Sequence, residues 1–282
     1  MYRFKLGCWC LLWLLVPTVS MASELGEHVE NPVIIRVSAG ANEYALAVLQ
    51  AAFSSQRQAV VFQAVQNIPT QDRAMRLLGK RDGIDVFWAV TSKEREKLGK
   101  AVLIPIEKGL IGYRYIVTRK NQPLALRDLM ALRKYSVGLR EDWPDQEVFS
   151  ANGFDVFSFA KDADEFEMLD SGRFDILPLD IFSKDLITAH PQLQIAPHTI
   201  IYYPSAVYFF VANEASALHQ MLSKGMEQIV QNGTLDSLLN AHYGVLLTEL
   251  ALAEKVKINL TNPLLPATAP LWRKEMWQSS TH

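Results

Sequence analysis

The chain has 282 residues, of which 28 are basic and 30 acidic, giving a formal net charge of −2. This slightly acidic balance excludes the basic excess that is typical of nucleic-acid-binding proteins. Both cysteines, Cys8 and Cys10, lie among the first 22 residues, so the 260 residues that follow can form no disulfide and offer no thiolate ligand or nucleophile.

The first 22 residues have the pattern of a secretory signal peptide. Arg3 and Lys5 precede the apolar run Leu6–Val16, and small residues follow at Ser20–Ala22. The run has 11 residues, fewer than the roughly 20 that span a bilayer. We therefore expect cleavage near Ala22 and export to the periplasm. An uncleaved signal anchor is the alternative.

Short β-rich apolar runs alternate with helical patterns after this leader. Strands are predicted at Val33–Ser38, Ala59–Val65 and Ile84–Ala89, and helices at Asn42–Ser54, at Gln71–Leu78 and from Thr91 onward. Strand–helix–strand order of this kind implies right-handed crossovers and a parallel sheet.

A second block of alternating elements lies between two long apolar runs, Gly109–Thr118 and Ile200–Val211. The block contains predicted helices at Leu124–Leu132, Asp145–Asn152 and Ala163–Ser171, and predicted strands at Tyr135–Leu139, Asp155–Phe157 and Phe174–Pro178. Helices at 214–231 and 234–242 follow the second run. The sequence thus predicts two lobes, 23–118 with 203–282 and an inserted 119–202. They would be joined only by extended crossings near Thr118 and Tyr203, about which the lobes would close like a hinge.

The C-terminal piece, which starts with an amphipathic helix from Leu246, ends in an irregular segment. Asn262–Pro270 contains three prolines in nine residues and cannot form a regular element. This segment and the residues that follow it contain large apolar side chains, among them Leu264, Trp272 and Trp277. A free tail would lack such residues, so we expect a strap packed on the body.

Arg95 follows a predicted strand and falls in the first turn of a predicted helix. Thr91–Glu94 has the spacing of a capping box, in which Thr91 and Glu94 would satisfy each other's backbone amides. The helix dipole disfavours a cation at this end, which suggests that Arg95 awaits an anion. The alternative is an ordinary surface ion pair with Glu94 or Glu96.

Several weak motifs together carry a family resemblance. They are Gly83–Val86 followed by Thr91–Arg95, the turn Gly172–Asp175, the run Ala206–Asn213 and the helix pair around Gly225–Thr234. With its two lobes, two crossings and export signal, the chain resembles a type II periplasmic substrate-binding protein. The nearest likeness is to the branch that binds amino acids for ABC importers. The fold implied is α/β, with two lobes that each contain a mainly parallel sheet flanked by helices.

The resemblance also implies a function. It implies a monomer that captures a small, polar, carboxylate-bearing ligand between its lobes and serves an inner-membrane ABC permease. Arg95 matches the arginine that grips the ligand's α-carboxylate, with Thr91 in the turn that presents it. Asp180 matches the position that offers a carboxylate to the α-amino group. Asp180 could instead simply cap the helix that follows it.

Other candidate ligand contacts follow predicted strands, at the edge where open α/β sheets bind their ligands. They are Tyr44, Trp88, Arg140 and Trp143. Trp88 could instead belong to the core, and Arg140 could be a solvated loop charge beside Glu141 and Asp142.

Enzymatic and metal-binding signals are sparse. The chain lacks an HExxH motif, a G-x-S-x-G motif and a phosphate-binding glycine loop, and its histidines are scattered. We therefore expect no catalytic residue, no metal and no cofactor. Two alternatives remain. One is a periplasmic dehydratase of the same fold with Glu43, Glu141 or Asp180 as a general acid. The other is a sensory module that reports ligand occupancy to a membrane protein.

Overall fold

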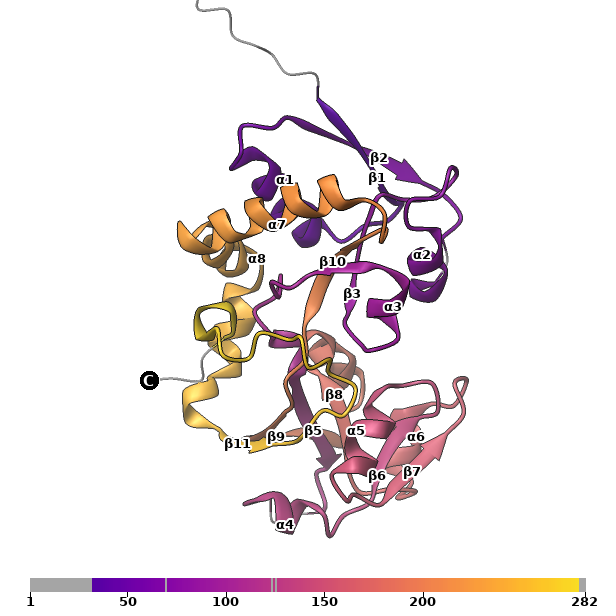
Figure 1. The fold of residues 1–282 in the computed structure, drawn as a ribbon. Coiled ribbons are helices and arrows are strands. Elements are labelled where there is room, and N and C mark those ends of the chain that lie inside the picture. Colours follow the sequence, from indigo (N-terminus) through magenta and orange to yellow (C-terminus); the bar gives the residue numbers. More distant parts are fainter. Residues whose placement is uncertain (1–31, 69, 123, 125, 279–282) are drawn as a thin grey trace, which may run out of the picture. The chain divides into compact units, whose positions relative to one another are not determined.

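The computed structural model (Figure 1) describes residues 32–278, apart from 69, 123 and 125. The described residues fall within one compact unit that begins at Pro32. The predicted signal peptide, residues 1–22, lies outside the described range. Within that range, no helix combines the length and the apolar character needed to cross a membrane.

The first elements form as predicted. β1 (Val33–Ser38) and β2 (Val60–Val65) pair in parallel and are connected by α1 (Glu43–Ser54). Asn42 begins this helix, because its side chain accepts a hydrogen bond from the Ala45 backbone amide. The buried face of α1 repeats at helical spacing: Tyr44, Ala45, Val48, Leu49, Ala52 and Phe53.

A three-stranded sheet, called here the β10 sheet, follows. Its order is β3-β10-β4, with both outer strands antiparallel to β10. The strands are β3 (Val86–Val90), β4 (Lys100–Val102) and β10 (Val207–Val211), and the nearby helices are α2 (Gln71–Leu77), α3 (Arg95–Leu98), α7 (Ser216–Gln231) and α8 (Thr234–Leu250). Helices α7 and α8 pack on α1.

A four-stranded sheet, called here the β5 sheet, has the order β11-β9-β5-β8. Its strands are β5 (Tyr113–Arg119), β8 (Leu177–Asp180), β9 (Leu193–Tyr202) and β11 (Val256–Asn259). β5 is antiparallel to both neighbours, whereas β9 and β11 are parallel. The β5 sheet is therefore mixed and the β10 sheet is antiparallel, whereas mainly parallel sheets were predicted.

The remaining elements continue from the β5 sheet. β6 (Val137–Arg140) and β7 (Val156–Phe159) form a parallel pair. The helices are α4 (Leu129–Leu132), α5 (Asp145–Ala151), α6 (Glu165–Asp170), and the 3₁₀ helices η1 (Leu110–Gly112), η2 (Ile181–Ala189), η3 (Leu252–Glu254) and η4 (Lys274–Met276). The predicted α/β succession is confirmed here, with shifts at the element ends.

Two chain segments, 103–112 and 203–206, connect the β10 sheet with the β5 sheet. They run side by side, since the Tyr203 amide donates to the Gly112 carbonyl at 3.2 Å. A Cβ on Gly112 would lie 2.2 Å from the Tyr203 carbonyl oxygen, so only glycine allows this approach. Thr118, where a crossing was predicted, is instead a buried residue within β5.

The C-terminal region connects the two sheets again. Residues 251–255 lead from α8 to β11, and the chain then turns back as an irregular segment, visible as the yellow trace in Figure 1. Helix α8 itself touches both sides, because the Tyr243 ring packs against Tyr44 of α1 and Phe182 of η2. The expectation that segments near Thr118 and Tyr203 are the only crossings is therefore wrong.

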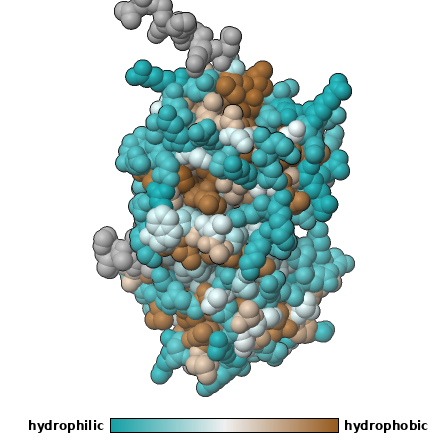
Figure 2. Space-filling model, viewed as in Figure 1, coloured by the Kyte–Doolittle hydropathy of each residue, from teal (hydrophilic) through white to brown (hydrophobic). Residues whose placement is uncertain are grey.

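The predicted docking of the C-terminal segment is confirmed. Trp277 is 9% exposed, and its indole nitrogen donates to the Pro270 carbonyl. Trp272, in contrast, is 78% exposed. On the face seen in Figure 2, hydrophobic residues form small areas among hydrophilic ones. Isolated exposed apolar residues of this kind are ordinary and carry no functional implication.

Candidate functional site

A cavity of about 1000 Å³, called here the cleft, is lined from both sheets. One wall comes from α2 and the loop after β3, and the other from the loop after β6, helix α5 and the end of β8. The crossing residues Ile111, Tyr203 and Ser205 lie between the walls, and Asn262 and Leu264 of the C-terminal segment complete the lining. β3, β6 and β8 all meet the cleft at their carboxyl ends, as the sequence predicted.

Arg95 lines the cleft and has no anionic partner in the described part of the chain. Its guanidinium donates to the Val90 carbonyl at 2.5 Å, and no carboxylate there forms an ion pair with it. Burial lowers the pKa of Arg95, an effect that the charge of Asp72 opposes. A desolvated cation without a counter-ion suits an anionic group from outside the chain.

The loop before Arg95 differs from the predicted capping box. The Ser92 hydroxyl accepts from the Arg95 amide at 3.2 Å, whereas the Thr91 hydroxyl donates to Glu96 at 2.8 Å. Glu94 makes no capping bond. The Thr91–Glu94 capping box is therefore wrong, because α3 begins only at Arg95, too late for Thr91 to cap it. Thr91 and Arg95 nevertheless both line the cleft.

An ion pair that the sequence did not reveal lies at the base of the cleft. Arg114 of β5 contacts Asp145 of α5 with an Nε–Oδ1 distance of 2.7 Å, and the Tyr203 hydroxyl donates to the same carboxylate at 2.7 Å. Burial alone would raise the pKa of Asp145, but the Arg114 charge and these hydrogen bonds hold it below its ordinary value. The three residues are far apart in the sequence, so no spacing could have identified the group.

Arg140 and Trp143 line the cleft as predicted, but Arg140 is already paired. Its Nε lies 2.6 Å from Oδ1 of Asp142, and its guanidinium lies 5.0 Å from the centre of the Trp143 ring. The local loop contact that was the alternative for Arg140 is thus present. Trp143 also meets Phe159 edge to face, which fixes its ring at the cleft wall.

Asp180 lines the cleft and also caps η2. Its carboxylate accepts from the Phe182 amide at 2.9 Å and from the Ser183 hydroxyl at 2.7 Å. Asp180 therefore caps the helix that follows it, which was the alternative prediction for this residue. A carboxylate offers about four acceptor positions, so these two bonds leave capacity for a cationic ligand group.

Two predicted contacts lie away from the cleft. Tyr44 is 1% exposed, and its hydroxyl donates to the Ile106 carbonyl at 2.5 Å. Trp88 packs against Phe87 and Phe209, since β3 pairs with β10 at that position. The core alternative for Trp88 is the observed one. Neither residue is among those that line the cleft.

The dehydratase alternative named three carboxyl groups, of which Glu141 and Asp180 line the cleft and Glu43 does not. A fourth, Glu107, stands in the crossing 103–112. Its Oε2 is buried and has no hydrogen-bond partner among the described residues. Burial and the charge of Asp180 raise the pKa of Glu107 to about 7. Glu107 does not line the cleft either.

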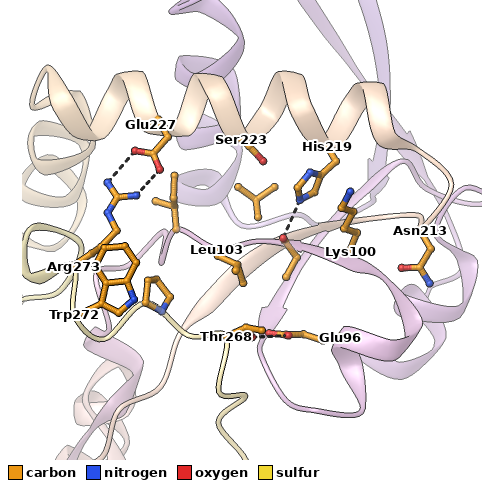
Figure 3. Close-up of a pocket in the computed structure, with 14 residues that line it drawn as sticks. Glu96, Lys100, Leu103, Asn213, His219, Ser223, Glu227, Thr268, Trp272 and Arg273 are labelled. Atoms are coloured by element: carbon orange, nitrogen blue, oxygen red, sulfur yellow. Dashed lines mark hydrogen bonds and ion pairs between the residues drawn. The ribbon is translucent and has the colours of Figure 1, made fainter.

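A second cavity of about 540 Å³ lies beside α7 and β4 (Figure 3). Its polar groups are largely engaged with one another. Arg273 pairs with Glu227 at 2.5 Å, and the His219 ring nitrogen lies 3.0 Å from the Ala101 carbonyl oxygen. The cleft, which is larger and contains an uncompensated cation, is the better candidate site. Among the described residues, no cluster of histidine and carboxylate side chains could hold a metal ion.

Comparisons with known proteins support the fold. No family model and no curated protein sequence matches the chain. Solved structures do match. The protein YckB of Bacillus subtilis covers 76% of this chain with 90% of its own, at 15% identity and a TM-score of 0.51. A Salmonella typhimurium periplasmic binding protein, described for its high arginine specificity, covers 74% with 98% of its own, at 17% identity and a TM-score of 0.50.

A histidine kinase sensor domain similar to periplasmic binding proteins also matches, at 16% identity and a TM-score of 0.45, covering 73% of this chain and 93% of its own. Identities this low establish architecture rather than activity. The parallel and antiparallel sheets and the helices that flank them agree with the first two of these matches. The chain has the two-lobe fold of the periplasmic binding proteins.

Proposed function

We propose that the protein is a solute-binding protein that holds a small amino-acid-like ligand in the cleft. The ligand would carry a carboxylate and an ammonium group. The protein would be exported to the periplasm and would deliver this ligand to an inner-membrane ABC permease. The two lobes of the proposal are the elements around the β10 sheet and those around the β5 sheet.

The observation that carries the proposal is the unpaired Arg95. Arg95 is half-buried, so its guanidinium loses part of its hydration. Such a group normally regains the lost hydrogen bonds from a carboxylate or phosphate. Arg95 has one backbone acceptor, Val90, and faces a cavity large enough for a small molecule. A ligand carboxylate at Arg95 would supply the missing charge.

The opposite wall of the cleft carries the complementary charge. Glu141, Glu147, Glu165 and Asp180 line it, and none of them forms a salt bridge within the described residues. Carboxylates attract an ammonium group, so the two walls together suit a zwitterion lying across the cleft. Arg114 and Asp145 form an ion pair with each other, so neither adds an uncompensated charge that would orient the ligand.

The test is native mass spectrometry of the protein after export through its own leader into a bacterial periplasm. We expect a bound small molecule that carries a carboxylate and an amine, released unchanged on denaturation. The Arg95→Ala variant should be recovered without this bound molecule. The Arg140→Ala variant should still contain it, because Arg140 is already paired with Asp142. Recovery of a dehydrated product instead of an unchanged ligand would contradict binding and support catalysis.

A further inference from the structure

The C-terminal strap, defined here as Leu260–Trp277, is anchored first on the β5 side of the molecule. The side-chain amide of Asn152, at the end of α5, makes two hydrogen bonds with the Thr261 backbone. Its Nδ2 donates to the Thr261 carbonyl at 2.7 Å, and its Oδ1 accepts from the Thr261 amide at 2.9 Å. Asn262 then donates to the Pro204 carbonyl in the second crossing at 2.8 Å. These bonds fix the start of the strap to α5 and to the crossing.

The middle of the strap is bonded to the loop that carries Arg95. Glu96 joins the two, because one carboxylate oxygen accepts from Thr91 at 2.8 Å and the other accepts from the Thr268 hydroxyl of the strap at 3.0 Å. Figure 3 shows this bond between Thr268 and Glu96, both of which line the second cavity. Glu96, the residue after Arg95, is thus bonded both to Thr91 of its own loop and to Thr268 of the strap.

A second bond supports the same loop. The Lys93 ammonium donates to the Pro263 carbonyl at 2.9 Å. Pro263 directly follows Asn262, the strap residue that is bonded to Pro204. Asn262 and Leu264, which flank Pro263, line the cleft. The strap therefore forms part of the cleft wall at the place where it bonds to the Arg95 loop.

The end of the strap packs against the first crossing, residues 103–112. The Trp277 ring covers Gly109, and a Cβ built on Gly109 would lie 2.5 Å from an atom of that ring. The Gln278 amide donates to the Lys108 carbonyl at 2.6 Å. Gly109 has a φ of 76°, so its conformation also favours glycine. The strap thus contacts both crossings as well as the Arg95 loop.

We propose that the strap is a positioning element. It ties the Arg95 loop to the β5 side of the molecule, and so holds the two walls of the cleft at a fixed separation before a ligand arrives. The proposal rests on the proposed function only in treating the cleft as the binding site. A hinge formed by two crossings opens freely, whereas an additional bonded connection restricts the motion. A pre-positioned guanidinium then loses less conformational freedom when the ligand binds.

The matched structures are consistent with an added segment. They cover 74% and 76% of this chain, although they are themselves covered over 98% and 90% of their length. The uncovered quarter exceeds the part that precedes Pro32, which is 31 residues. The described part of this chain therefore contains segments beyond the shared fold.

The experiment measures the separation of the two sides without any ligand. The chain after residue 22 has no cysteine, so two introduced cysteines can be spin-labelled specifically. Lys224→Cys on α7 and Glu167→Cys on α6 both replace exposed helical residues. Double electron–electron resonance spectroscopy then gives the distribution of distances between the two spin labels. We expect one narrow distribution for the parent protein.

Two variants release the strap in different ways. Lys93→Met with Thr268→Val removes both hydrogen bonds between the strap and the Arg95 loop. Lys93→Arg with Thr268→Ser is its control, because it keeps both donors. Gly109→Ala drives the Trp277 ring off the crossing, and Gly233→Ala is the control. Gly233 has a φ of 77° but no atom within 4 Å of an added Cβ, so it reproduces the backbone strain without the collision.

Both release variants should broaden the distribution and shift it to longer distances, and both controls should leave it narrow. If Gly109→Ala fails to fold, the Lys93→Met, Thr268→Val variant decides the question. A parent distribution that is already broad would overturn the proposal, as would release variants that match the parent. Because no ligand is present, this result is independent of whether the cleft binds an amino acid.

Discussion

Arg114 and Asp145 form an ion pair at the base of the cleft, with side chains that are 11% and 13% exposed. Arg114 also donates to the Ile111 and Tyr113 carbonyls, and its guanidinium lies 4.9 Å from the centre of the Tyr203 ring. The pair therefore links β5, α5 and both crossings. It supports the cleft from below, and the Arg114 charge is compensated there, whereas Arg95 has no carboxylate partner among the described residues.

Removal of one member of this pair should destabilise the protein strongly. Asp145→Ala leaves the Arg114 charge buried without compensation, which costs about 3–5 kcal/mol in comparable cases. Urea unfolding followed by circular dichroism measures the loss. Asp142→Ala is the control, because the Arg140–Asp142 pair lies at the surface and should contribute far less. Equal effects of the two substitutions would contradict a structural role for Arg114 and Asp145.

Stability should depend on pH through Glu107. Burial raises the pKa of Glu107 from its ordinary 4.5 to about 7 in the folded protein. Between these values the folded state retains a proton that the unfolded state releases, so this group's contribution to stability is fully present below pH 4.5. It is lost as the pH rises to about 7.

The loss should be at most about 3 kcal/mol, and less to the extent that the side chain meets solvent. Glu107→Gln isolates it, because glutamine does not titrate. The free energy of unfolding of the parent, minus that of Glu107→Gln, should fall across this pH range and then level off. A difference that rises with pH would show that the carboxylate is stabilised rather than destabilised by its surroundings.

Two substitutions at Asp180 should separate its capping from its charge. Asp180→Asn keeps an oxygen that can accept from the Phe182 amide, whereas Asp180→Ala removes it. Both should weaken ligand binding, since both remove the negative charge. Only Asp180→Ala should also lower the free energy of unfolding, by about 1 kcal/mol for a lost cap. Unchanged affinity in Asp180→Asn would restrict Asp180 to a structural role.

Tyr44→Phe should change stability without changing ligand affinity. The Tyr44 hydroxyl donates to a backbone carbonyl inside the protein, and the residue does not line the cleft. Loss of this bond leaves the Ile106 carbonyl without that donor and costs about 1–3 kcal/mol. Thermal unfolding and a binding titration on the same preparation check both halves. A large loss of affinity with intact stability would return Tyr44 to the site.

The fold was predictable because its local patterns agree with its final packing. α1 combines an Asn42 cap with apolar residues at helical spacing, and β1 and β2 are short β-branched runs joined by that helix. The long run Gly109–Thr118 misled the prediction, because periodicity alone cannot show where in an apolar run the strand begins. The chain crosses at 103–112, and Thr118 lies within β5.

The site was predictable only in part. Arg95, Asp180 and Trp143 follow strands whose ends meet at one edge, which sequence order can reveal. Arg114–Asp145 and Glu96–Thr268 join residues that are 31 and 172 positions apart, and no local signal marks such pairs. Trp88 was mistaken for a contact because a strand-end aromatic looks the same in sequence whether it faces a cleft or a core.

The central claim is that Arg95 binds the anionic group of the ligand. Isothermal titration of the standard amino acids against the ligand-free protein identifies the tightest binder, and the same titration is then repeated with Arg95→Ala. We expect about tenfold to hundredfold weaker binding, the equivalent of about 1.5–3 kcal/mol for a lost charge-assisted hydrogen bond. Arg95→Lys should also bind more weakly because an ammonium cannot make two parallel bonds. Arg140→Ala, already paired with Asp142, should bind nearly as the parent does. A dissociation constant that Arg95→Ala leaves unchanged would contradict the account.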